Sequence, residues 1–451
     1  MKLSILYLVT LFSTLVSTLP SPRKRIQGNQ DTCTWLEHCL GSTCNTFDDC
    51  SDALICTDGV CAVDNVVDPV KSTKPTTTIA KSTSTLKPTT MTSKSLTSKS
   101  ITLKTTKHST TFKSKSTTTS SLAPSPTISI IFEKPGLYFG VNAQKDIELT
   151  LPNLSINGHY PAMVGFYLGM NDSNDFVQNF KDFCDATKVA YSSVKVPMPI
   201  ILLTIEPDSA DVAFSSATVT SFASVAKSCN NFGLKLIIRF APEFNIPDIP
   251  WYGNPTQYIV NFRAFATALK AQTSKSVMFW CPNIAYEGLP ADTFDSYYPG
   301  DSFVDIVGLD LYYAGDDAGN NAVSSSDQFA NNISGVNTNQ PLWNFYARFA
   351  AAKNKPFVIG ETSAFYHMGK PGSDQLAMKQ SWWKQLFNVD TLQKFPLFRG
   401  VMWFNFYKFE SNEYRDMRLF EEYVDGNPAV DARLLPAFIN DIAGVPVVFA
   451  N

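Results

Sequence analysis

Eight short apolar segments, rich in β-branched and aromatic residues, recur between residues 137 and 404. Each is almost continuously apolar rather than alternating, which is typical of parallel strands buried on both faces. Stretches with helical periodicity separate most of them, for example Thr218–Asn231, Pro255–Thr273 and Asp374–Leu392. The predicted strands are Leu137–Val141, Met163–Tyr167, Pro199–Thr204, Leu234–Phe240, Ser276–Trp280, Phe303–Leu309, Pro356–Gly360 and Gly400–Phe404.

This alternation of strands and helices predicts an α/β fold with a parallel sheet and right-handed crossovers. Eight strands in the 318 residues from 134 to 451 fit a (β/α)8 TIM barrel. A doubly wound open sheet is the alternative, but it does not need eight strands of such even length.

The N-terminus has the pattern of an export signal. Lys2 precedes the apolar run Leu3–Val16, which is too short to span a bilayer, so we expect a signal peptide over residues 1–19 and a secreted, extracellular protein. A propeptide is predicted over residues 20–32, where Arg23-Lys24-Arg25 is either a processing site or a solvated charge run. No stretch of 18 or more apolar residues occurs after the N-terminus, so no membrane span is predicted. Three Asn-x-Ser glycosylation sequons fit secretion: Asn153, Asn171 and Asn332.

Six cysteines lie between Cys33 and Cys61. A segment of this size cannot bury enough apolar surface to fold alone, so we predict a disulfide-rich module over residues 33–63 whose pairing the sequence does not set. Its one tryptophan, Trp35, either stacks on a sugar or fills a small core.

Residues 64–133 form a predicted disordered linker. Ser, Thr, Lys and Pro dominate it, and the part from 70 to 127 contains ten lysines and no acidic residue. Such a segment buries too little apolar surface to offset its chain entropy, and its Ser/Thr/Pro content is typical of an O-glycosylated spacer.

The charge balance and the absence of certain motifs argue against several classes of function. With 37 basic and 40 acidic residues the net charge is −3, which argues against a nucleic-acid partner. The sequence has no Gly-rich phosphate loop, and its histidines lack metal-ligand spacing, so neither a cofactor nor a metal is predicted. The four histidines are His38, His108, His159 and His367.

Two glutamates, Glu243 and Glu361, follow the fourth and seventh predicted strands. Active sites of such barrels lie at the carboxyl ends of the strands. Two carboxyl groups, one kept protonated as an acid and one ionised as a nucleophile, are the minimum machinery of retaining glycoside hydrolysis. The alternative is that each glutamate forms an ion pair with an arginine, for example Arg239.

Other polar and aromatic residues near the strand ends fit a sugar cleft. Asn245 and Asn283 offer amides to sugar hydroxyls, and Trp251, Trp280 and Trp403 offer rings that stack on the apolar faces of sugars. Ordinary core packing is the alternative for the tryptophans. Of the three remaining cysteines, we expect Cys184 and Cys229 to pair and Cys281 to be buried and free.

Four motifs, in order, make residues 134–451 similar to glycoside hydrolase family 26, a family of clan A barrels. RFAPEFN followed by WYGNPTQYIVNFR resembles its acid/base segment, YYPGDSFVDIVGLDLYY its strand-6 signature, PFVIGETS its nucleophile strand and VMWFNFYK its strand 8. The resemblance implies Glu243 as acid/base, Glu361 as nucleophile and retention of configuration. It further implies that Tyr312 hydrogen-bonds the nucleophile, Trp403 forms a floor under the sugar and Arg239 orients the carboxylates.

The chain departs from this pattern at Pro242, where mannanases of the family usually carry His before the acid/base glutamate. Proline stiffens the strand end. β-Mannan, mixed-linkage β-glucan and β-1,3-xylan all remain compatible. We expect a monomeric, endo-acting hydrolase whose partner is its polysaccharide substrate. A wall-associated transglycosylase and a non-catalytic carbohydrate-binding barrel are the alternatives.

Overall fold

The structure is a computed structural model of the chain. It describes residues 54–57, 60–63 and most of 130–450, with gaps at 145–155, 157, 171–174, 194–196, 286–288, 291, 337–342, 423 and 425. The chain divides into two units, residues 1–119 and 120–451. In the first unit, β1 (Leu54–Thr57) pairs antiparallel with β2 (Val60–Val63). The predicted signal peptide, propeptide and linker, the rest of the cysteine-rich module, and the sequons Asn153 and Asn171 lie outside the described residues.

The second unit contains a closed barrel of eight parallel strands. Neighbouring strands follow one another in sequence, and β12 pairs with β3 to close the ring, which excludes the open sheet. All eight predicted strands are confirmed. They are β3 (Leu137–Ala143), β5 (Met163–Met170), β6 (Ile200–Pro207), β7 (Lys235–Phe240), β8 (Ser276–Trp280), β9 (Ile306–Asp310), β10 (Phe357–Thr362) and β12 (Phe398–Asn405).

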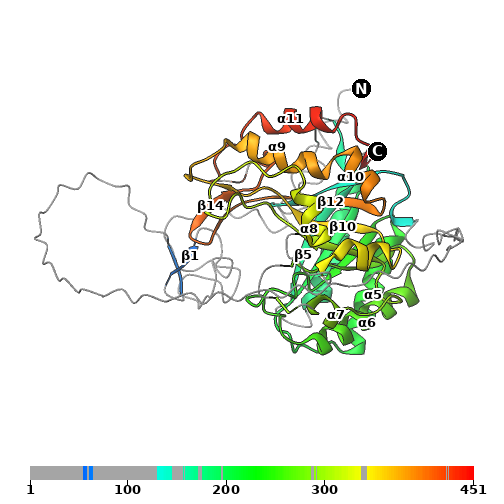
Figure 1. Cartoon of the computed structure of the whole chain (residues 1–451). Helices are drawn as coiled ribbons and strands as arrows, with labels where there is room; N and C mark the ends of the chain where they lie inside the picture. Colours follow the sequence, from blue (N-terminus) through cyan, green and yellow to red (C-terminus); the bar gives the residue numbers. More distant parts are fainter. Residues whose placement is uncertain are drawn as a thin grey trace, which may run out of the picture. The chain divides into compact units, whose positions relative to one another are not determined.

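Helices connect most of these strands and lie outside the barrel (Figure 1). Capping residues set several of their starts: the Ser215 side chain accepts from the Thr218 amide, and Asn254 caps a helix that begins at Pro255. The described helices are α4 (Asp175–Ser193), α5 (Ser216–Asn231), α6 (Pro255–Gln272), α7 (Thr293–Ser296), α8 (Gln328–Ser334), the π-helix η5 (Tyr346–Ala351), α9 (Gln375–Leu386), α10 (Val389–Lys394) and α11 (Leu434–Ile442).

One predicted helix is wrong in its extent. The segment Asp374–Leu392 is not continuous, because α9 ends at Leu386 and α10 begins at Val389. Asn388 between them has extended backbone and accepts from the Asp390 amide, so it starts a new helix. The predicted Cys184–Cys229 disulfide is confirmed and links α4 to α5. Cys281 is buried and free, as predicted.

The apolar residues form two cores, as expected for strands buried on both faces. The larger lies between the strands and the helices, and includes Phe139, Val401 and Trp403. The smaller contains residues of alternate parity from all eight strands, such as Met163 and Met402, and therefore fills the barrel. Towards the carboxyl ends of the strands the inward positions become polar, and this change locates the candidate site.

A small sheet of β11 (Tyr366–His367), β14 (Glu413–Asp416) and β13 (Tyr407–Glu410) follows the carboxyl ends of β10 and β12. Its base is fixed by buried charges: Lys379 of α9 donates to the Arg418 carbonyl and to Asp416. No helix in the described part of the chain is long and apolar enough to cross a membrane.

Candidate active site

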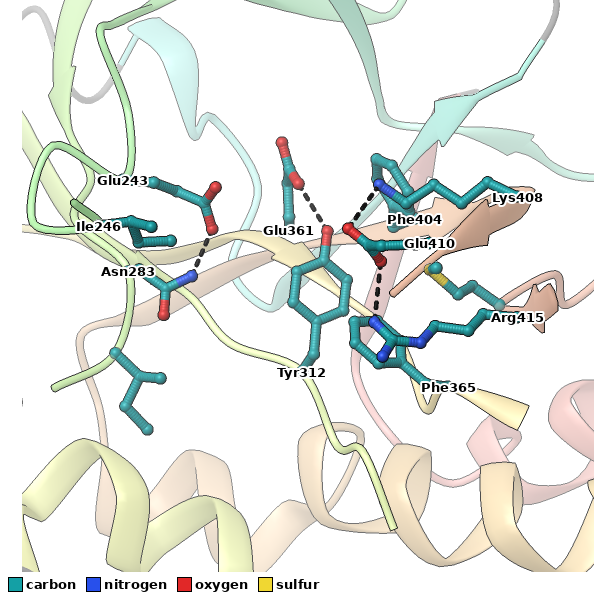
Figure 2. A pocket seen from close by; sticks show the side chains of 12 residues that line it. Glu243, Ile246, Asn283, Tyr312, Glu361, Phe365, Phe404, Lys408, Glu410 and Arg415 are labelled. Atoms are coloured by element: carbon teal, nitrogen blue, oxygen red, sulfur yellow. Dashed lines mark hydrogen bonds and ion pairs between the residues drawn. The ribbon is translucent and has the colours of Figure 1, made fainter. Parts of the chain in front are cut away.

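A cavity of about 350 Å³ opens at the carboxyl ends of the barrel strands. In Figure 2, Glu243 and Asn283 lie on one side of it and a group of charged side chains on the other, with Glu361 and Tyr312 between them. The cavity is lined by Glu243, Ile246, Asn283, Ile284, Tyr312, Glu361, Phe365, Phe404, Lys408, Glu410, Arg415 and Met417.

Glu243 lies on a strained turn directly after β7. Ala241 and Glu243 both have left-handed backbone, with φ of 44° and 54°, on either side of Pro242. Residues other than glycine rarely adopt such angles, so the surrounding structure must hold the turn in place. The Glu243 amide donates to the Cys281 carbonyl at 3.0 Å, and the Trp251 indole donates to the Pro242 carbonyl at 2.6 Å.

The Glu243 carboxyl group has one side-chain donor among the described hydrogen bonds, the amide of Asn283. Asn283 is itself held by Asn245, which accepts from its backbone amide at 2.8 Å and donates to its carbonyl at 3.0 Å. Burial, followed by the nearby charge of Glu361, raises the pKa of Glu243 to about 7, against the opposing effect of the Asn283 hydrogen bond. Glu243 is therefore suited to act as a proton donor near neutral pH.

Glu361 has opposite surroundings. The strand register of β10 shifts after Ile359, which marks an irregularity in the strand. This irregularity allows the Glu361 side chain to form hydrogen bonds with groups that face the barrel interior. Tyr167 donates to one carboxylate oxygen at 2.6 Å, Tyr312 to the other at 2.5 Å, and the Arg239 guanidinium forms an ion pair with it. Burial alone would raise the pKa of Glu361, but the guanidinium and the two hydroxyls outweigh it and hold the pKa below its ordinary value.

Arg239 connects Glu361 to a third carboxyl group. It is fully buried, donates from Nη1 to both oxygens of Asp310 at 2.8 and 2.9 Å, and donates from Nε to Thr204 at 2.9 Å. Gly360 makes room for this pair, since a Cβ there would lie 2.6 Å from Asp310 Oδ1. Burial raises the pKa of Asp310 well above its ordinary value, and Arg239 opposes that rise.

The structure brings together most of the predicted site residues. Glu243, Glu361, Asn283 and Tyr312 line the cavity, and Arg239 lies directly behind them. The predicted contact of Tyr312 with the nucleophile is present. Two further predicted sugar ligands lie behind the cavity lining: Asn245 is fully buried against Asn283, and half-buried Trp251 supports the Pro242 turn.

The structure does not bring Trp280 and Trp403 to the cavity, which contradicts their predicted role as sugar platforms. Both are completely buried in the outer core. Trp280 stacks on Phe345 at 5.6 Å, and the Trp403 indole donates to the Met417 carbonyl at 3.0 Å. Side chains alternate along a strand, so the aromatic ring of β12 that reaches the cavity belongs to the adjacent Phe404.

Sequence reasoning missed several residues of the site. Tyr167 ends the second predicted strand and Asp310 ends β9, and a polar group at the carboxyl end of a strand is a signal that the sequence carries. Lys408, Glu410 and Arg415 belong to the β13–β14 hairpin, whose alternating charges directly follow the last barrel strand. Within the described residues no group of three His, Cys, Asp or Glu side chains could hold a metal ion.

A closed (β/α)8 barrel with two glutamates of opposite electrostatic environment at its carboxyl end defines a class of acid/base barrel enzymes. Comparison with known proteins narrows this class. The family model for glycosyl hydrolase family 26 matches residues 250–395. This match lies within the barrel and agrees with the resemblance predicted from the motifs.

A curated protein, endo-chitosanase C of Aspergillus oryzae, is 54% identical over 47 residues, which are 10% of this chain and 11% of that protein. The chain thus spans only about a tenth of the length of that relative. Solved structures include the catalytic domain of a Bacillus sp. JAMB-750 endo-β-1,4-mannanase (16% identity, TM-score 0.49, covering 72% of this chain and 92% of that one). A Bacteroides ovatus β-mannanase is also similar (14% identity, TM-score 0.43, covering 72% and 94%).

Proposed function

We propose that this chain is a secreted, retaining glycoside hydrolase that cleaves a neutral β-linked polysaccharide, with Glu243 as acid/base and Glu361 as nucleophile. One observation carries the proposal: the two carboxyl groups line the same cavity, with the pKa of Glu243 raised to about 7 and that of Glu361 lowered. This is the pairing of protonated acid and ionised nucleophile that a double displacement needs.

In the first step Glu361 attacks the anomeric carbon and the bond to the leaving oxygen breaks. Glu243 gives its proton to that oxygen, and a covalent glycosyl-enzyme forms. In the second step Glu243 takes a proton from water, the water oxygen attacks the anomeric carbon, and the Glu361 carboxylate is released. The two displacements restore the starting configuration.

The charges around the cavity favour a neutral substrate. With Glu243 protonated, the remaining lining charges are two carboxylates, Glu361 and Glu410, and two cations, Lys408 and Arg415. Neither a polycation such as chitosan nor a polyuronate meets a complementary field there. β-Mannan and mixed-linkage β-glucan are the neutral polymers that we propose as substrates.

The secreted, modular organisation is also a proposal, supported by the sequence. The predicted cysteine-rich module, held by a glycosylated linker, would bind carbohydrate and raise the effective concentration of the barrel on an insoluble polymer. A truncated chain that begins at residue 120, where the second unit begins, would then keep its rate on soluble oligosaccharides and lose rate on insoluble polymer.

The decisive experiment measures reducing-sugar release from β-mannan, mixed-linkage β-glucan, β-1,3-xylan and chitosan. We expect one neutral polymer to be cleaved, and Glu243→Ala and Glu361→Ala each to lower the rate by about 10³-fold or more. Proton NMR of the first product reports its anomeric form. An inverted product would contradict the retaining mechanism, and binding without cleavage of any polymer would indicate a carbohydrate-binding barrel.

A further inference from the structure

His367 of β11 is a buried residue that the proposed reaction does not use. Only 3% of it is exposed, and both of its ring nitrogens have partners. Nδ1 lies 2.6 Å from Glu413 Oε1 on β14, and Nε2 lies 2.7 Å from the Ala314 carbonyl oxygen. A carbonyl oxygen only accepts hydrogen bonds, so Nε2 carries a proton. An ionised carboxylate also only accepts, so Nδ1 carries one as well.

We propose that His367 is a positioning residue that, as a doubly protonated imidazolium, holds the wall of the substrate cavity formed by the β13–β14 hairpin. The bonds continue from the ring to the cavity. Glu413 Oε1 also accepts from Arg415 Nε at 2.8 Å, and Arg415 Nη1 donates to Glu410 at 2.9 Å. Lys408 completes the chain through its ion pair with Glu410 at 3.2 Å.

The end of this chain forms the cavity wall. Lys408, Glu410 and Arg415 all line the cavity, opposite Glu243 (Figure 2). The Arg415 guanidinium lies 5.0 Å from the centre of the Phe365 ring, and that ring is 4.8 Å from Tyr312, the hydroxyl donor to Glu361. The wall therefore contacts the rings beside the nucleophile, and we assign it to substrate binding.

Each of the two hydrogen bonds of the His367 ring needs a proton on the ring nitrogen that makes it. Arg415 and Glu413 face it from β14, and Asp316, on the loop after β9, interacts with its charge. The buried ammonium group of Lys379, on α9, forms an ion pair with Asp416. A neutral imidazole donates from one nitrogen only, so it would lose either the Ala314 or the Glu413 bond.

Nitrogen-15 NMR of the histidine rings in the full chain tests the protonation directly, without substrate. We expect the His367 ring to show protons on both nitrogens in the folded chain. His367→Gln identifies the signal, and His159→Gln, a change at an exposed ring, is the matched control. A single neutral tautomer for His367 would overturn the proposal.

Kinetics tests the role of the wall and rests on the proposed hydrolase function. His367→Gln and Arg415→Gln should each raise KM about three- to tenfold with little change in kcat, and the double variant should be no worse than the single ones. Additive effects, or equal losses in kcat, would overturn the positioning role. If His367→Gln fails to fold, Arg415→Gln and the NMR result still decide. If no polymer is cleaved at all, the proposed function fails, whereas the NMR result stands by itself.

Discussion

The ends of β7 and β10 present the same side chain to one cavity and give it opposite properties. Glu361 receives two hydroxyl donors and a guanidinium, so its charged form is favoured. Glu243 receives a neutral amide and lies beside the charge of Glu361, so its protonated form is favoured. The difference lies in the groups that neighbouring strands bring to each carboxyl group, and it fits the two chemical roles that we propose.

An aryl glycoside with a good leaving group should separate these roles most strongly. A dinitrophenolate leaves without protonation, so Glu243→Ala should keep the first step within about tenfold of wild type and then stall at the glycosyl-enzyme. Glu361→Ala lacks the attacking group and should lose about 10³-fold or more on the same substrate. A stopped-flow trace of dinitrophenolate release measures both.

The two variants should also differ in the time course of dinitrophenolate release. Glu243→Ala should give a burst of one equivalent followed by a slow phase, and Glu361→Ala should give no burst. A burst with Glu361→Ala, or equal losses in both variants, would mean that the roles of the two glutamates are reversed or shared.

The next largest effect should come from Gly360, which has no reactive group. A methyl group there would lie 2.6 Å from Asp310 Oδ1, 2.8 Å from Cys281 Sγ and 3.1 Å from Arg239 Nη1. Gly360→Ala should therefore displace Arg239 from Glu361 and lower kcat by about 10- to 100-fold. The control is Gly444→Ala, because no atom lies within 4 Å of the added methyl group. Full activity of Gly360→Ala would contradict the positioning role of Arg239.

The barrel was predictable from sequence because its strands are continuous apolar runs of even length. The same property hid which residues face inward. In Gly400–Phe404 both faces are apolar, so the pattern gives no parity, and Trp403 was assigned to the cavity in place of Phe404. Trp280, between inward-facing Phe279 and Cys281, was misplaced for the same reason.

The two glutamates were found because carboxyl groups at the ends of buried strands are unusual. Their environments were less accessible to sequence reasoning. The donors to Glu361 come from Tyr167, Tyr312 and Arg239, on three different strands or strand ends. The β10 irregularity lies at Gly360, between Ile359 and Glu361, whereas the left-handed turn at Ala241 and Glu243 contains no glycine that would have indicated it.

The pH profile of kcat/KM tests the difference between Glu243 and Glu361 through a smaller but more specific effect. The first step needs Glu243 protonated and Glu361 ionised, so kcat/KM should fall above pH about 7 and hold down to below the ordinary range of a glutamate. These apparent values belong to the pair. Asn283 stabilises the charged form of Glu243, so Asn283→Ala should move the basic limb upward by about half a unit to one unit. An unchanged or lowered basic limb would show that another group sets it.

The smallest effect should come from Trp251, which supports the Glu243 turn from behind. Trp251→Phe keeps an aromatic ring and removes the N–H that donates to the Pro242 carbonyl at 2.6 Å. The loss of one such bond should lower kcat/KM about two- to fivefold and leave the pH limbs in place, because no charged group changes. Trp383→Phe, which removes an indole bond to Asp441 on α11, is the matched control. If Trp251→Phe instead moved the basic limb, the strained turn would be setting the protonation of Glu243 as well as its position, and the contrast between the two strand ends would begin in the backbone.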